Sequence, residues 1–324
     1  MLALYESSSD QAQTASLGDL RENVEAARRS GAKVVAIPPA FREDIPVQES
    51  LSFLKRQGRL SPAVWLGGIP RAEYYDQLYD ALLQRNVRLL NDPIQFRRSM
   101  YLDESYPYLG ELTFETIAVD DSTGLERAMS RFDGPMVVRT AVPRTKGRDW
   151  SQCLAQTRDQ ARELGESLLA RPRVPGRPAL VVRRWQPLRR MADGLTRELR
   201  VFVFEGTVLE MGAYWAAQTA SMDDPAVAPA LSLAREAQRR LDVPYLAVDV
   251  GELAEGGFVV LETWDAQCAT TRTISKASLW TRLLRLASRL RPSELPRRLS
   301  SAGRSVSGSR RGLAGAESVR DESD

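Results

Sequence analysis

Histidine is absent from this 324-residue chain, and its absence removes several kinds of active site at once. Without an imidazole there is no Ser-His-Asp or Cys-His triad, no HExxH zinc site and no histidine general base. Catalysis would therefore depend on carboxylates, guanidinium and ammonium groups, hydroxyls, or a metal held by oxygen atoms.

Cysteine and long apolar runs are also scarce. Cys153 and Cys268 lie far apart without metal-ligand spacing, and a disulfide framework needs more cysteines. This usage is typical of a reduced compartment, so we expect a cytoplasmic protein. The N-terminal residues lack the basic and apolar regions of a signal peptide, and no apolar run approaches the ~18 residues of a membrane span. The sequence therefore predicts no membrane partner.

Charge is distributed unevenly. The 45 Lys and Arg residues exceed the 42 Asp and Glu residues by three, yet residues 272–311 alone hold eleven basic residues and one acid. The body of the chain is therefore mildly acidic, whereas a nucleic-acid reader usually has a basic face on its folded domain. A nucleic-acid or anionic-surface binder using this stretch stays open as an alternative. The favoured interpretation is a helix with a solvated Arg face, followed by a disordered Arg/Ser/Gly-rich tail over residues 292–324.

Helices alternate with short apolar strands in the first part of the chain. The pattern predicts helices at 18–30 and 73–86 and strands at 33–37, 63–66 and 87–90. This alternation favours a parallel α/β unit over residues 1–92.

Beyond residue 93 the predicted elements are mixed. Helices are expected at 94–102, 122–132, 150–169, 229–240 and 275–290, and strands at 116–119, 135–139, 178–185, 245–251 and 257–263. Residues 196–215 contain two alternating strands joined by Glu205-Gly206, a hairpin signal. The fold class is therefore α/β, with α+β lobes after the parallel unit.

Acidic residues lie on two of these predicted strands. Asp249 is embedded in an apolar strand, Glu262 ends the next apolar run, and Asp265 follows three residues later. Carboxylates at neighbouring strands can converge on Mg²⁺, which prefers such oxygens together with phosphate and water. Solvated strand-end acids would give the same spacing, but an uncompensated carboxylate inside an apolar strand is costly.

Basic residues follow the strand at 135–139. Arg139 ends this strand and Lys146 lies in the loop after it, so the two could clamp a polyphosphate from two sides. Two ordinary surface bases beside a turn would look the same, since no Gly-rich phosphate loop is present.

A third group lies on the strand at 178–185 and on the hairpin. Arg183 lies on the first, and period-2 alternation places Glu198 and Arg200 on one face with Phe202, opposite Leu199. Such charges often form only a structural salt bridge. Alternatively, Arg200 would stabilise a developing anion such as a transferring phosphoryl group.

The order of these pieces resembles the ATP-grasp superfamily, and more narrowly its clade named for one arginine and two lysines. The similarity is carried by segments over about residues 60–275: EYYDQLYDALLQRNVRLLNDP (73–93), YPYLGELTFETI (106–117), LVVRRWQPL (180–188), ELRVFVFEG (198–206) and DVGELAEGGFVVLETWDAQ (249–267).

The resemblance implies an ATP-dependent ligase that joins a small-molecule carboxylate to an amine through an acyl phosphate. It implies a pre-ATP-grasp unit (1–92), a lid lobe (93–178), a C-terminal lobe with the metal site (179–291) and the tail (292–324). ATP and one or two Mg²⁺ ions would be bound. The implied roles are as follows: Asp249, Glu262 and Asp265 as Mg²⁺ ligands, Arg200 as the catalytic group, and Arg139, Lys146, Val182, Arg183, Trp185 and Glu198 as nucleotide-binding residues.

Four positions depart from the family pattern, one of them Ala266 in place of a common glycine. Arg139 stands where a phosphate-binding lysine is expected, Arg184 replaces a glutamate in the hinge strand, and Trp264 replaces a metal-binding asparagine. These departures leave open a second alternative, a catalytically degenerate ATP-grasp protein that binds a nucleotide or a partner.

Overall fold

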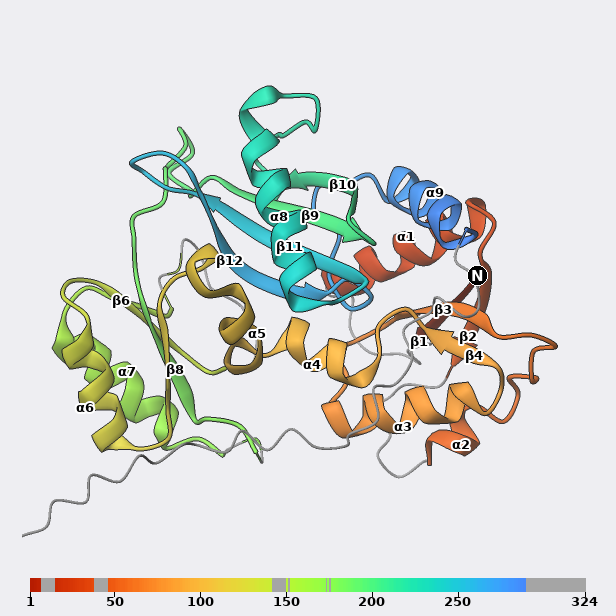
Figure 1. Cartoon of the computed structure of the whole chain (residues 1–324), viewed down its shortest axis with the longest axis horizontal. Coiled ribbons are helices and arrows are strands. Elements are labelled where there is room, and N and C mark those ends of the chain that lie inside the picture. The colour runs from red at the N-terminus through yellow and green to blue at the C-terminus, as the bar shows by residue number, and fades with distance from the viewer. Residues whose placement is uncertain are drawn as a thin grey trace, which may run out of the picture.

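Figure 1 shows a computed structural model of the chain, which describes residues 1–6, 15–37, 46–141, 150, 152–172, 174 and 176–289. Within these ranges, three four-stranded sheets follow one another along the sequence. The first is parallel and the other two are antiparallel, which confirms the expected α/β class with α+β lobes. None of the helices in this part of the chain is long and apolar enough to cross a membrane.

The parallel sheet lies at the right of Figure 1 and has the strand order β2-β1-β3-β4. Its strands are β1 (Leu2–Glu6), β2 (Lys33–Ile37), β3 (Ser61–Leu66) and β4 (Val87–Leu89). The sequence pattern does not predict β1, because a short run at a chain end has no turn signal on its N-terminal side. This strand nevertheless lies between two partners in the sheet.

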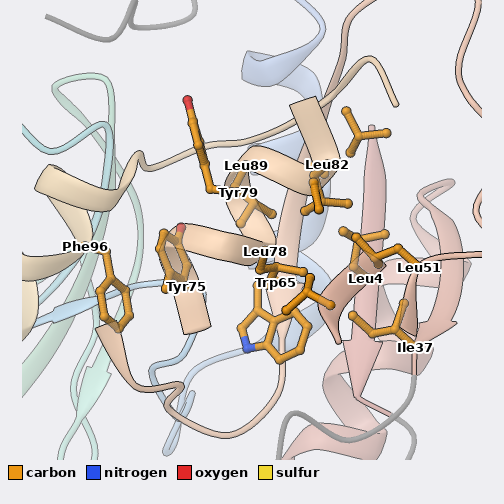
Figure 2. Close-up of a cluster of buried hydrophobic side chains, with 14 of the residues drawn as sticks. Leu4, Ile37, Leu51, Trp65, Tyr75, Leu78, Tyr79, Leu82, Leu89 and Phe96 are labelled. Atoms are coloured by element: carbon orange, nitrogen blue, oxygen red, sulfur yellow. The ribbon is translucent and has the colours of Figure 1, made fainter. Parts of the chain in front are cut away.

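Helices cover both faces of the parallel sheet. On one face, α1 (Ala15–Arg29) and α9 (Lys276–Ala287) pack around Ala3 and Val64. On the other face, α2 (Val47–Ser50) and α3 (Ala72–Leu83) pack around Leu4 and Trp65, in the cluster of Figure 2. Neighbouring residues of one strand thus enter different cores, as the two-residue strand period requires.

A helical segment links the parallel sheet to the rest of the molecule. It comprises α4 (Pro93–Met100), α5 (Leu102–Leu109) and the 3₁₀ helix η1 (Gly110–Leu112). The start of α4 is set by a capping box, in which Asp92 accepts from the backbone of Gln95 and the Gln95 side chain accepts from the backbone of Asp92. The predicted helix at 94–102 is interrupted at Tyr101, whose backbone is extended.

The second sheet, which we call the lid sheet, has the order β5-β8-β6-β7. Its elements are β5 (Thr116–Val119), α6 (Ser122–Arg131), β6 (Met136–Arg139), β7 (Leu154–Ala155), α7 (Arg158–Leu169) and β8 (Leu180–Arg184). The helix predicted at 150–169 begins only at Arg158, because β7 comes first and Thr157 caps the helix. Strand β8 pairs with β5 and β6, although the predicted boundary at residue 178 assigns it to the C-terminal lobe.

The third sheet, the C-terminal sheet, has the order β10-β9-β11-β12. Its elements are β9 (Glu198–Phe204), β10 (Thr207–Ala213), the 3₁₀ helix η2 (Pro225–Val227), α8 (Ala228–Leu241), β11 (Tyr245–Glu252) and β12 (Phe258–Asp265). Glu205 and Gly206 have φ angles of +46° and +75°, as the primed turn of a tight hairpin requires. Helix α8 packs on one face around Val201 and Val248, while on the opposite face Phe202 and Ala247 pack in the cluster with α1 and α9. Arg200 and Asp249 lie on this second face, beside that cluster.

Candidate active site

Two acidic residues face one another on neighbouring strands of the C-terminal sheet, the inner strand β11 and the edge strand β12. Asp249 on β11 is paired in register with Glu262 on β12, and their side chains are 0% and 2% exposed. Asp265 lies three residues beyond Glu262, so strand alternation directs it to the other face. The structure thus brings two of the three predicted acids together and separates the third.

Asp249 is bound by three N–H groups. The Arg200 guanidinium donates from Nε to Oδ1 at 2.7 Å and from Nη2 to Oδ2 at 2.8 Å, and the Trp264 indole donates to Oδ2 at 3.1 Å. Burial alone lowers the pKa of Arg200, but the adjacent Asp249 carboxylate raises it overall. The pair is a buried, bidentate ion pair, the strongest geometry that an arginine and a carboxylate adopt.

Arg200 also contacts the loop that follows β12. Its Nη1 donates to the carbonyl and the hydroxyl of Thr270 at 2.9 and 3.0 Å, and its guanidinium lies 5.2 Å from the Tyr214 ring centroid. The Arg272 guanidinium lies over the same ring at 4.2 Å. Thr270, Tyr214 and Arg272 were missed by sequence reasoning, since nothing in the local pattern joins this loop to β9.

Glu262 is paired with an arginine from the lid sheet. Arg139, at the end of β6, donates through Nη1 to Glu262, and its side chain is 6% exposed. Burial lowers the pKa of Arg139 and the Glu262 carboxylate more than restores it. The ion pair therefore joins the lid sheet directly to β12.

Arg183 makes a second link between these sheets. From β8 it donates to the Thr113 and Thr116 hydroxyls and to the Leu261 carbonyl, at 2.7–3.1 Å. Burial, followed by the nearby Arg139 charge, lowers its pKa to about 10. The guanidinium remains charged at neutral pH and each of its three nitrogens donates a hydrogen bond, so its contacts are those of a structural bridge.

The remaining predicted nucleotide-binding residues lie in different surroundings. Glu198 is fully buried and accepts from the Trp150 indole at 3.1 Å and from the Thr196 hydroxyl at 2.6 Å. Val182 is paired on both sides within the lid sheet and its side chain packs among the lid helices. The Trp185 ring lies 5.3 Å from that of Trp150, in an apolar cluster between the lid and C-terminal sheets. Lys146 lies outside the described residues.

Asp265 belongs to a buried polar network instead. Its Oδ1 accepts from Asn91 and from the backbone of Gln267, both at 2.9 Å, and its Oδ2 accepts from the Gln267 side chain at 3.2 Å. Gln267 also donates to Tyr75 of α3, and Asn91 bonds the backbone of Tyr245 on β11. Despite these donors, burial raises the pKa of Asp265 to about 7. The network fastens the parallel unit to the C-terminal sheet.

The acidic pair fits a magnesium site only if a phosphate completes it. In the part of the chain that the structure describes, no three His, Cys, Asp or Glu residues lie close enough to hold a metal together. Asp249 and Glu262 supply two carboxylates side by side. That is a usual protein contribution to Mg²⁺, whose remaining ligands are substrate phosphates and water.

Comparison with solved structures gives the same fold. A RimK domain protein ATP-grasp from Sphaerobacter thermophilus DSM 20745 superimposes with a TM-score of 0.61 at 17% identity, covering 87% of this chain and 98% of that one. D-cycloserine synthetase DcsG gives 0.59 at 14% identity, covering 89% and 100%. The ATP-grasp ligase PsnB, complexed with a minimal precursor, Mg and ADP, gives 0.55 at 10% identity, covering 89% and 98%.

A comparison of sequences assigns the family. No curated protein matches the chain by sequence. The family profile of the ATP-grasp domain, family 3 of the clade named for one arginine and two lysines, matches residues 122–283, half of the chain. This range contains the lid sheet except for β5, and the whole C-terminal sheet with its buried arginine–carboxylate pairs. The protein therefore belongs to the ATP-grasp superfamily, in family 3 of that clade.

Proposed function

We propose that the protein is an ATP-dependent ligase that joins a carboxylate to an amine. The observation that carries this proposal is the buried group of Arg139, Arg200, Asp249 and Glu262, which lies where the lid sheet meets the C-terminal sheet. These residues supply the anion-binding and cation-binding groups that phosphoryl transfer needs, and no histidine is required.

The proposed reaction has two steps. A carboxylate oxygen attacks the γ-phosphorus of ATP, the bond to the bridging oxygen breaks, and ADP leaves. The amine then attacks the acyl phosphate carbonyl, inorganic phosphate leaves, and the amine loses a proton to give the amide. Arg200 would stabilise charge on the transferring phosphoryl group, because its planar fork matches phosphate oxygens. Arg139 would hold the nucleotide phosphates from the lid side.

Magnesium would be held by Asp249 and Glu262 and would neutralise charge on the nucleotide phosphates. In this proposal Asp265 is a structural residue, since it lies on the opposite face and is held by Asn91 and Gln267. The ATP-grasp ligase PsnB, whose fold this chain shares, was crystallised with Mg and ADP, which supports the choice of these ligands.

The test is ADP release with purified protein, Mg·ATP and a panel of small carboxylates and amines, including amino acids and short peptides. Turnover that needs both an acid and an amine, and that Arg200→Gln abolishes while nucleotide binding persists, supports the proposal. Arg240→Gln is the matched control, because Arg240 pairs with Glu236 and Glu111 on α8 and η1. ADP release that is independent of both substrates would contradict it.

One observation favours a second candidate, a nucleotide-binding protein without ligase activity. The Trp264 indole adds a third donor to Asp249, where the family pattern has a metal-binding asparagine. Restoring the pattern with Trp264→Asn separates the two candidates. A catalytically inactive protein would bind Mg·ATP without turnover and gain ADP release in this variant, whereas a competent ligase is active without the change.

A further inference from the structure

We propose that Arg139 and Arg200 occupy the magnesium carboxylates in the nucleotide-free protein, so that a divalent cation binds more tightly when a nucleotide is also bound. The inference rests on the proposed function, because it concerns the same site. It adds an order of events: the arginines move from carboxylate to phosphate as the metal takes the carboxylates.

The first support is that each of the two carboxylates is paired with an arginine. Both oxygens of Asp249 accept from the Arg200 fork at 2.7 and 2.8 Å, and Glu262 is paired with Arg139. All four side chains are at most 6% exposed. A cation approaching from solvent therefore meets carboxylates that are already bound and largely covered.

The second support is the charge balance. The two guanidinium groups and the two carboxylates sum to zero, which a buried group requires when water cannot screen it. Adding a divalent cation alone would displace both guanidinium groups and leave an excess of about two positive charges in a buried site. Adding the polyphosphate at the same time removes this excess, because its oxygens bind both the guanidinium forks and the metal.

The third support is the geometry of Arg139. Its Nη2 is buried and makes no hydrogen bond to any residue that the structure describes. A phosphate oxygen would use this donor. Because Arg139 lies on the lid sheet and Glu262 on the C-terminal sheet, exchange at this pair also releases one contact between the two sheets. The family pattern has a lysine at this position. A lysine has one nitrogen in place of the planar guanidinium, so it lacks the separate nitrogen atoms with which Arg139 can contact Glu262 and a phosphate at the same time.

The experiment uses Mn²⁺ in place of Mg²⁺, because the paramagnetic resonance signal of free Mn²⁺ falls as the ion is bound, and the Mn²⁺ that the analogue binds without protein is measured separately and subtracted. The full-length protein is titrated with and without a non-hydrolysable ATP analogue. We expect the analogue to tighten Mn²⁺ binding by a factor in the range of about 5–150, the usual size of coupling between sites. Equal Mn²⁺ affinity with and without the analogue would overturn the inference while leaving the proposed function intact.

Variants sharpen the test. Arg139→Gln releases Glu262, so Mn²⁺ should bind more tightly without nucleotide, the analogue should bind more weakly, and the coupling factor should fall. Arg240→Gln, the control outside the site, should keep the wild-type coupling. If Arg139→Gln is poorly stable, Mn²⁺ alone should raise its melting temperature while leaving the wild type unchanged. Unchanged coupling together with no Mn²⁺ effect on melting in Arg139→Gln would overturn the inference. Absence of any nucleotide binding in the wild type would overturn the proposed function and this inference together.

Discussion

The carboxyl group of Asp265 is expected to make stability depend on pH in a specific direction. Burial raises its pKa from the ordinary 3.8 to about 7. The three N–H groups that Asn91 and Gln267 donate favour the charged form and lower the pKa, but burial outweighs them. The pKa of Asp265 is higher in the folded than in the unfolded protein. Its stabilising contribution to the free energy of unfolding is therefore fully present below about pH 4 and is lost as the pH rises through about 7. A pKa change of this size corresponds to about 4 kcal/mol.

Asp265→Asn removes the titration. An amide in this place cannot accept from Gln267 at Oδ2, which costs about 1 kcal/mol of one hydrogen bond. At about pH 4, where the Asp265 contribution is still fully present, the variant should therefore unfold more easily than the wild type by about that amount. Near pH 8, where the wild type buries a charge, the variant should be the more stable by up to about 3 kcal/mol.

The measurement is the free energy of unfolding in urea at several pH values between 4 and 8, for both proteins. Their difference cancels the titration of all other groups. Glu255→Gln, at an exposed acid in the turn before β12, is the control and should show no such trend. A difference between Asp265→Asn and wild type that stays constant across this range would refute the reasoning.

Two further predictions concern packing. Leu78 is fully buried in the cluster of Figure 2, so Leu78→Ala should lower the free energy of unfolding by about 2–5 kcal/mol, measured in urea, while Ile69→Ala at a 44% exposed position should change it little. A Cβ on Gly212 would lie 2.5 Å from the Thr273 hydroxyl, so Gly212→Ala should lower the melting temperature and cost about 1–3 kcal/mol. A Cβ on Gly58 would have no atom within 4 Å, so Gly58→Ala should leave the melting temperature unchanged. Equal effects of the two glycine variants would contradict the close approach of β10 to the loop that contains Thr273.

The fold was predictable where local signals act alone. Alternation over 196–204 places Arg200 and Phe202 on one face and Val201 on the other, and the structure confirms this in the pairing of Arg200 with Asp249. The Glu205-Gly206 turn also follows from local chemistry, since both residues adopt positive φ. These features depend on residues close in sequence.

Prediction failed where distant partners decide. Strand β1 is a strand because β2 and β3 pair with it on both sides, and nothing in residues 2–6 alone indicates that. Residues 154–155 form β7 against β6 rather than the first turns of a helix. The partners of Asp265 were equally hidden, because Asn91 lies 174 positions away in the sequence, and its predicted role as a metal ligand stays a prediction.

The site itself was partly predictable. The arginines and acids of the ELR hairpin and the closing strands are visible in the sequence, and the structure brings Arg200 to Asp249 and Arg139 to Glu262. Which acid pairs with which arginine was hidden, because the Arg139–Glu262 contact joins residues 123 positions apart. The roles of these residues in nucleotide and metal binding stay predictions.

The central claim is tested most directly by calorimetric titration of the wild type and of the Asp249→Asn/Glu262→Gln double variant with ATP, with and without Mg²⁺. We predict magnesium-dependent binding to the wild type and its loss in the double variant, whose fold is checked by its melting curve. Equal binding of Mg·ATP to both folded proteins, or no binding to the wild type, would contradict the account.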